Sequence, residues 1–297
     1  MLRNELPQLD STTEKELALI DRLIAATRLY NSTEAVQELL EFTTRLREFA
    51  PFNAMLLHIQ KPGITHAATA HDWYYRFGRV PKQDARPLVV LRTMGPVDFV
   101  FDILDTEGRD VPDSAFSFPA LGKFVEKRFL ELISSIQKEK IDVYEFNAGD
   151  DKAGYIELTH RSNRPQGKNS YQLKYNCNHP FPTKFVTVAH ELAHLYLGHL
   201  GADRGRHVPD RLRTDSKLKE IEAEMTACLI AKRNGVESKS ESYLQNFQEE
   251  FDSFGRFSLY AVMRAANAIE TVMGISAQKL WNEKASAQIF EQVTHEE

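Results

Sequence analysis

The fold and the site that we predict for the second half of the chain depend on the segment "PTKFVTVAHELAHLYLGHLG", Pro182 to Gly201. Its apolar residues predict a helix that packs into a core. His190 and His194 are four residues apart, so both imidazoles lie on one face of that helix, with Glu191 between them. This HExxH pattern supplies two ligands and one base for a catalytic zinc ion. The alternative is an ordinary core helix, in which two buried imidazoles and a carboxylate would be costly without a partner.

A catalytic zinc ion needs a third protein ligand, and the next predicted helix, residues 216–233, offers three candidates in Glu220, Glu222 and Glu224. Glu220 and Glu224 are one turn apart on one face, whereas Glu222 points elsewhere. We expect Glu220 to bind zinc and Glu224 to orient a ligand histidine. The alternative is a solvated helix face. His199 has the wrong spacing for the third histidine of a metzincin, which follows the second by six residues.

Together, "TVAHELAHLYLGH" and "EIEAEMTACLIA" resemble the ImmA/IrrE-type metallopeptidases. The resemblance implies a gluzincin-like site with Zn²⁺ bound by His190, His194 and Glu220. Glu191 would be the base and Glu224 the partner of a ligand histidine. Most members have Asn or Asp at the position of Glu224, so the roles of Glu220 and Glu224 are open to exchange. The implied substrate is a regulatory protein, for example a transcriptional repressor.

The N-terminal half carries three further motifs, "RLREFAPFNAMLLHIQKPG", "HDWYYRFGRVPKQDARPLVVL" and "FDILDTEGRDVP". They resemble the N-terminal domain of ArdC-type antirestriction proteins. That resemblance implies binding of single-stranded DNA and a zincin domain further along the chain. Gln83 and Asp84 depart from the usual Gly-Glu of the family, and Arg86 takes the place of a second basic residue.

Charge and aromatic content give the same segment a physical basis for binding single strands. Between Lys61 and Arg92 six basic residues face two acidic ones, and aromatic residues are interleaved with them. Such a mixture neutralises phosphates and stacks bases. The alternative is a small domain with an aromatic core and a basic, solvated face. The candidate contacts are Trp73, Tyr74, Arg76, Arg79, Lys82 and Arg86.

The length of 297 residues predicts one large or two medium domains. A polar, turn-rich segment from Asp105 to Pro119 separates them, giving an ArdC-like domain with leading helices at 1–115 and a metallopeptidase domain at 116–297. Strands are expected at residues 87–93, 97–104, 141–146, 153–160 and 171–176. The fold class is α+β: a small α+β domain, then a zincin-like domain with a small antiparallel sheet and a helical C-terminal part.

Composition narrows the function classes. A net charge of −5, with 42% hydrophobic and 27% charged residues, argues against wholesale nucleic-acid or membrane binding. Two cysteines without a CxxC pair fit a reducing compartment, and we expect a cytoplasmic protein.

Three functions are compatible with these features. The first is a zinc metalloendopeptidase that cleaves a regulatory protein. The second is a DNA-binding antirestriction or stress-regulatory protein whose zinc is structural, with a fourth protein donor such as Cys177. The third is an interaction module without metal.

Overall fold

The structure is a computed structural model that describes residues 30, 32–92, 97–111, 126–149, 152–236 and 258–276. Its helices and small sheets confirm the α+β class. The chain forms two compact units, residues 1–30 with 53–116 and residues 31–52 with 117–297. The expectation from sequence places residues 31–52 with the N-terminal domain instead. The apolar pattern of residues 11–30 predicts a helix, which falls almost entirely outside the described residues.

The first unit contains two small antiparallel sheets, of order β1-β4-β3 and β2-β5. Strands β3 and β4 are the two expected at residues 87–93 and 97–104, and the turn between them lies outside the described residues. The elements are α3 (Pro51–Gln60), β1 (Ala67–Ala68), α4 (Ala70–Phe77), β2 (Arg79–Pro81), β3 (Leu88–Leu91), β4 (Val97–Asp102), η2 (Ile103–Asp105) and β5 (Thr106–Gly108).

Side-chain amides of α3 pair with the outer strand β3. Asn53 donates to the carbonyl of Leu91 at 3.0 Å and accepts from its amide at 2.9 Å. Gln60 makes the same pair of bonds with Val89, at 2.9 and 2.8 Å. These bonds satisfy backbone groups that an edge strand would otherwise expose.

The second unit begins with α2 (Thr33–Arg45), which Ser32 caps by accepting a hydrogen bond from Ala35. The apolar pattern of residues 32–50 predicts a helix that Pro51 stops, but α2 already ends at Arg45. Pro51 is instead the first residue of α3, a position where its missing N–H costs nothing.

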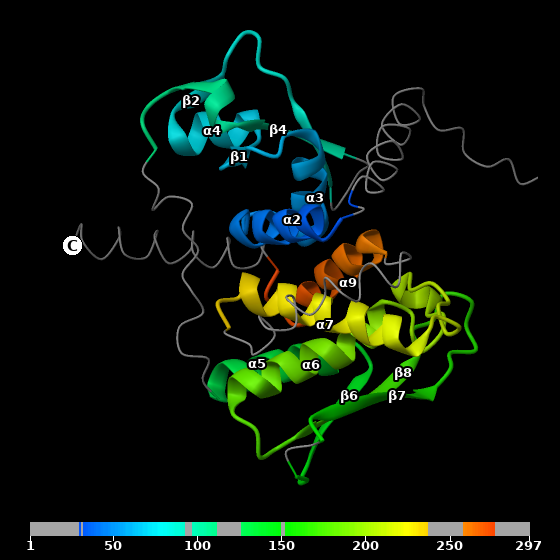
Figure 1. The fold of residues 1–297 in the computed structure, drawn as a ribbon. Helices are drawn as coiled ribbons and strands as arrows, with labels where there is room; N and C mark the ends of the chain where they lie inside the picture. Colours follow the sequence, from blue (N-terminus) through cyan, green and yellow to red (C-terminus); the bar gives the residue numbers. More distant parts are fainter. Residues whose placement is uncertain are drawn as a thin grey trace, which may run out of the picture. The chain divides into compact units, whose positions relative to one another are not determined.

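The core of the second unit is layered, and Figure 1 shows the sheet with α5 and α6 on one face and α7 and α9 beyond α6. The expected strands and the helix at residues 216–233 are confirmed. The elements are α5 (Glu126–Gln137), β6 (Ile141–Phe146), β7 (Gly154–His160), β8 (Ser170–Asn176), α6 (Phe181–Tyr196), η4 (Arg204–Arg206), α7 (Ser216–Arg233) and α9 (Leu259–Val272).

The three-stranded sheet has the order β6-β8-β7, with β8 in the centre. The hairpin of β7 and β8 is antiparallel, but β6 runs parallel to β8, with Ile141 opposite Tyr171. The expected sheet was antiparallel throughout, and this detail is corrected. The polar turn between β7 and β8 predicts that these two strands form an antiparallel hairpin. It does not predict the direction of β6, which pairs with the other edge of β8. Strand β7 is left as an edge strand beside α6.

Helix α7 is covered by α6, α9 and α2 and is buried along most of its length. Arg233, near its end, donates to the carbonyls of Thr43 and Phe49 and forms a buried ion pair with Glu270 of α9. Within the described ranges, no helix has both the length and the apolar character needed to cross a bilayer.

Candidate metal centre

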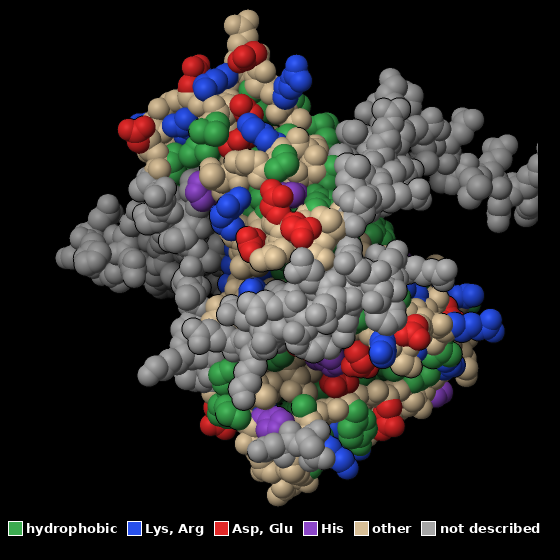
Figure 2. Space-filling view, viewed as in Figure 1, with side chains coloured by type: hydrophobic (Ala, Val, Ile, Leu, Met, Phe, Trp, Pro, Cys, Tyr) green, Lys and Arg blue, Asp and Glu red, His purple; other side chains and the backbone are tan. Residues whose placement is uncertain are grey.

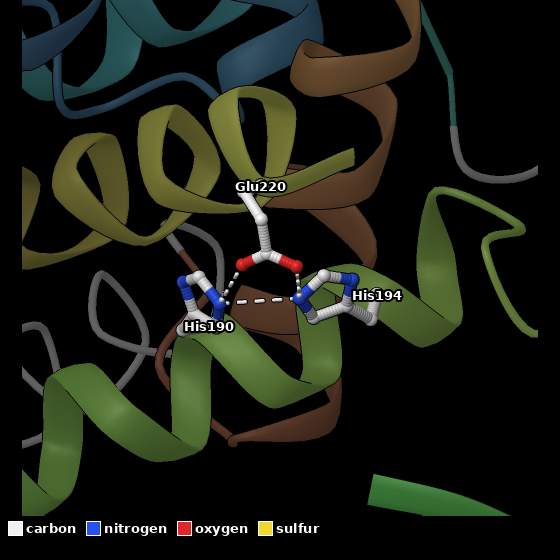
Figure 3. A group of neighbouring side chains, drawn as sticks. All are labelled: His190, His194 and Glu220. Atoms are coloured by element: carbon white, nitrogen blue, oxygen red, sulfur yellow. Dashed lines mark hydrogen bonds and ion pairs between the residues drawn. The ribbon is translucent and has the colours of Figure 1, made fainter. Parts of the chain in front are cut away.

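Two packed helices bring together the three predicted ligands. His190 and His194 lie on α6, and Glu220 lies on α7, whose start is fixed by Asp215 accepting hydrogen bonds from the amides of Lys217 and Leu218. Figure 3 shows the carboxylate of Glu220 directed from α7 toward both imidazoles. One donor atom from each of the three side chains lies within 4.8 Å of the others.

Each imidazole nitrogen lies close to one edge length of a tetrahedral site from the other nitrogen and from its nearest oxygen of Glu220. The Nε2 atoms of His190 and His194 are 3.1 Å apart, and they lie 3.4 and 3.6 Å from the two oxygens of Glu220. Ligand bonds of about 2.0–2.1 Å place the corners of a tetrahedron about 3.3–3.4 Å apart. The donor set therefore fits a small divalent cation.

The charges of the site are strongly coupled. Burial opposes the charged form of His190, but hydrogen bonds with Glu220 and Glu224 outweigh it and raise the pKa of His190 to about 9. Close contact with the imidazoles of His190 and His194 holds the pKa of Glu220 far below its usual range. A proton on His190 would therefore compete with a metal ion for the position between the ligands.

Glu224 lies on the far side of His190, with its Oε2 atom 3.3 Å from Nδ1 of that ring. A carboxylate there accepts the Nδ1 proton and leaves Nε2 directed toward Glu220. The structure therefore places Glu220 among the donor atoms and Glu224 against the outer nitrogen of His190.

Glu191 is placed beside the edge strand β7. Burial raises the pKa of its carboxyl group, while His190, His194 and a hydrogen bond from the backbone of Ile156 act in the opposite direction. Gly154, at the start of β7, allows the close approach. A Cβ atom there would lie 2.6 Å from Cγ2 of Thr187 and 3.6 Å from Cγ of Glu191.

A buried network that the sequence does not predict lies behind His194. Nδ1 of His199 lies 3.1 Å from Nδ1 of His194, and Nε2 of His199 lies 3.0 Å from Glu222. Glu222 is fully buried, and its other oxygen accepts from Arg211 at 2.6 Å and from the amide of Ser258 at 3.3 Å. The available signal was the apolar surrounding of Glu222 on α7, which predicts a buried carboxylate that needs partners.

Cys177, the proposed fourth donor of a structural site, is half-buried and its sulfur lies 3.7 Å from the side-chain oxygen of Asn178. In the described part of the chain, the group of donor atoms at this centre consists of His190, His194 and Glu220.

The residues predicted to contact nucleic acid differ widely in exposure. Trp73 is fully buried, and its Nε1 donates to the carbonyl of Phe101 at 2.8 Å. Its proposed role in stacking on bases is therefore corrected, because a ring in the core offers no free face. Tyr74 and Tyr75 are 59% and 71% exposed, and their rings contact each other edge-on at 4.9 Å.

The basic residues divide in the same way. Arg79 donates to the hydroxyl and the carbonyl of Thr106 and to the carbonyl of Arg109, and Lys82 donates to the carbonyl of Leu104. These donors connect β2 to β5 and its neighbours. Figure 2 shows basic, acidic and apolar side chains intermixed on the visible face of this unit. Arg76 and Arg86 are exposed, and Arg76 lies 3.8 Å from Asp72.

Two glycines allow the backbone to approach closely where β2 pairs with β5. Gly78 ends α4 in the left-handed conformation, with φ of 61°. Gly108 has φ of 136°, and a Cβ atom there would lie 2.4 Å from the carbonyl oxygen of Gly78. Gly78, Arg79 and Gly108, which belong to the motifs "HDWYYRFGRVPKQDARPLVVL" and "FDILDTEGRDVP", thus have a structural explanation.

Fold and site together define an α+β protein with an HExxH-type candidate metal centre. No family model matches the sequence, and the comparison with curated proteins gave no match. The chain is similar to two crystal structures of the antirestriction protein ArdC from plasmid R388. The metal-free structure has 15% identity over 92% of this chain and 99% of that one, and the Mn(II)-bound structure has 14% over 87% and 97%. Both TM-scores are 0.38. The assignment of the candidate metal centre therefore depends only on the distances within this chain.

Proposed function

We propose that the chain is a zinc-dependent metallopeptidase. The observation that carries the proposal is the convergence of two imidazole nitrogens and one carboxylate at tetrahedral spacing, next to a half-buried glutamate on the same helix. Two imidazoles with one carboxylate are a common ligand set of catalytic zinc, in which a water molecule takes the fourth position.

His190, His194 and Glu220 would hold the ion. Glu220 is 58% exposed, so a substrate reaches the centre from solvent, and both imidazoles are largely buried. When bound, Zn²⁺ lowers the pKa of a water molecule and polarises a carbonyl group. The rest of the reaction depends on the protein's own side chains.

Glu191 would act as the general base. A carboxyl group whose pKa is raised by burial binds a proton more readily near neutral pH than an exposed glutamate does. It would take a proton from the attacking water as the new C–O bond forms. It would then deliver that proton to the amide nitrogen as the C–N bond breaks.

Strand β7 provides a surface for an extended substrate. It is an edge strand of the sheet, it lies along α6, and Ile156 reaches Glu191 through its backbone. A peptide that adds to such an edge is held by main-chain hydrogen bonds, largely independently of its sequence. We therefore propose an extended segment of a protein, such as a transcriptional repressor, as the substrate.

The test compares Glu191→Gln with the wild type. The variant should retain Zn²⁺, since Glu191 is outside the donor group, and should lose peptide hydrolysis by about 10²–10⁴-fold, the usual contribution of a general base. Substrates are found by comparing intact proteomes of cells that express either form. Equal cleavage by the two forms would exclude this mechanism.

A second candidate function is binding of single-stranded nucleic acid by the first unit. The observation that favours it is the exposed pair Tyr74 and Tyr75 beside Arg76, because exposed aromatic rings stack on bases and a cation neutralises phosphate. The resemblance of the N-terminal motifs to ArdC-type antirestriction proteins agrees with this function. Binding of nucleic acid by the first unit is compatible with a metal centre elsewhere in the chain.

A further inference from the structure

The turn after α6 directs His199 back toward the metal centre. Gly198 has φ of 82°, its amide donates to the carbonyl of Leu195, and the amide of His199 donates to the carbonyl of His194 at 2.9 Å. This pair of bonds is a Schellman motif, which favours glycine at its left-handed position. A Cβ atom at residue 198 would also lie 2.1 Å from the carbonyl oxygen of Pro209. The "GH" after the HExxH helix therefore places an imidazole behind His194.

The partners of His199 determine which of its nitrogens carries the proton. Glu222 is fully buried and accepts from Arg211 and from the amide of Ser258, so its carboxylate is ionised and acts only as an acceptor. His199 must then donate from Nε2. A neutral imidazole that donates from Nε2 carries its lone pair on Nδ1, the atom that faces Nδ1 of His194.

That lone pair sets the proton position of His194. The two Nδ1 atoms are 3.1 Å apart, and since His199 accepts there, His194 must donate from Nδ1. The Nε2 atom of His194 then has its lone pair free, facing His190 and Glu220. Only this tautomer can bind a metal ion from that side.

We propose that Glu222 and His199 are positioning residues that fix His194 in its metal-binding tautomer and hold Arg211 and the start of α9 to the centre. The proposal rests on the metal centre of the proposed function. It extends that function by a residue pair that contacts neither metal nor substrate. The outer nitrogens of the two ligand histidines then have different partners. Glu224 contacts His190 directly, whereas His194 contacts His199, which in turn contacts Glu222; we call this pair the relay.

The substitution Glu222→Gln tests the direction of this relay. A glutamine that donates to His199 forces the proton of His199 onto Nδ1, which leaves His194 protonated on Nε2 and closed to metal. In the opposite orientation the NH₂ group of the glutamine would face Arg211, so that two donors would face each other. Zn²⁺ affinity, measured by competition with a chromogenic chelator, should fall by about 10–100-fold, the usual cost of losing an outer-shell partner.

Two substitutions of His199 provide an independent pair. His199→Leu removes the relay and should also lose about 10–100-fold in Zn²⁺ affinity. His199→Gln keeps an acceptor toward His194 and a donor toward Glu222, so its affinity should lie closer to the wild type. If Glu222→Gln does not fold, this pair decides the proposal.

Glu270→Gln is the matched control, because it breaks a buried Arg–Glu pair of the same unit away from the donor group. It should lower the melting temperature and leave Zn²⁺ affinity unchanged. The proposal is overturned if folded Glu222→Gln and His199→Leu bind Zn²⁺ as the wild type does, or if Glu270→Gln loses affinity to the same extent. A wild-type chain that binds no Zn²⁺ would instead refute the proposed function.

Discussion

The face between α6 and α7 and the segment from Thr69 to Arg109 both carry motifs of charged and ring-bearing residues, but they use them differently. Between α6 and α7, imidazole and carboxylate atoms converge on one point at distances of 3.1–3.6 Å. In the N-terminal segment, Arg79 and Lys82 donate to backbone carbonyls, and Trp73 fills the core. In this protein the motif at the candidate reactive site brings side-chain polar atoms together at one point, whereas the motif that determines the fold directs its donors to the backbone.

The largest effect on folding should come from Trp73→Ala. Removing a fully buried aromatic residue costs about 3–5 kcal/mol, and the hydrogen bond to Phe101 is lost as well. Hydrogen exchange of residues 67–109 should rise strongly, with little change in the second unit. Tyr75→Ala is the control, and its effect on stability should stay within about 0.5 kcal/mol. Equal protection in both variants would contradict a core role for Trp73.

A smaller effect is expected on nucleic-acid affinity. Tyr74→Ala and Tyr75→Ala should each weaken binding of a single-stranded oligonucleotide by about 1–3 kcal/mol, the usual value of a stacked base. Fluorescence anisotropy at several salt concentrations measures this. Phe99→Ala, which removes another exposed ring of the same unit, should have no effect. If all three variants bind as the wild type does, the first unit has no stacking surface at Tyr74 and Tyr75.

The affinity for metal should increase with pH. His190 has a pKa of about 9 without metal, so below pH 9 the ion must displace a proton, and affinity should rise by about tenfold per pH unit for each proton released. Above pH 9 it should level off. By the same linkage, stability that charged His190 gives the metal-free protein is complete below pH 6.5 and lost as pH rises through 9.

Calorimetry of Zn²⁺ binding at pH 7.5, in two buffers of different ionisation enthalpy, counts the protons released. About one proton is expected for the wild type. Glu224→Gln removes one of the hydrogen bonds that raise the pKa of His190 and should reduce the number. Identical heats in both buffers would show that no proton occupies the site.

Local patterns in the sequence predict most elements of the second unit and the residues that meet at its centre. His190, His194 and Glu220 are recognisable because helical spacing fixes which residues share a face. Helical spacing does not predict the parallel pairing of β6 with β8 or the relay through His199, because both depend on contacts between segments that have no fixed spacing in the chain. The burial of Trp73 likewise follows from the tertiary packing of α4 and β4, which composition cannot distinguish from an exposed aromatic platform.

The metal content of the purified chain, after equilibration with Zn²⁺ and removal of the free ion, tests the central claim most directly. The wild type and Glu191→Gln should each retain one ion per chain. His194→Ala should retain none, since the loss of a ligand should exceed the roughly 10–100-fold cost of losing an outer-shell partner. A wild-type chain without bound zinc, or a His194→Ala variant with a full complement, would contradict the assignment of this centre.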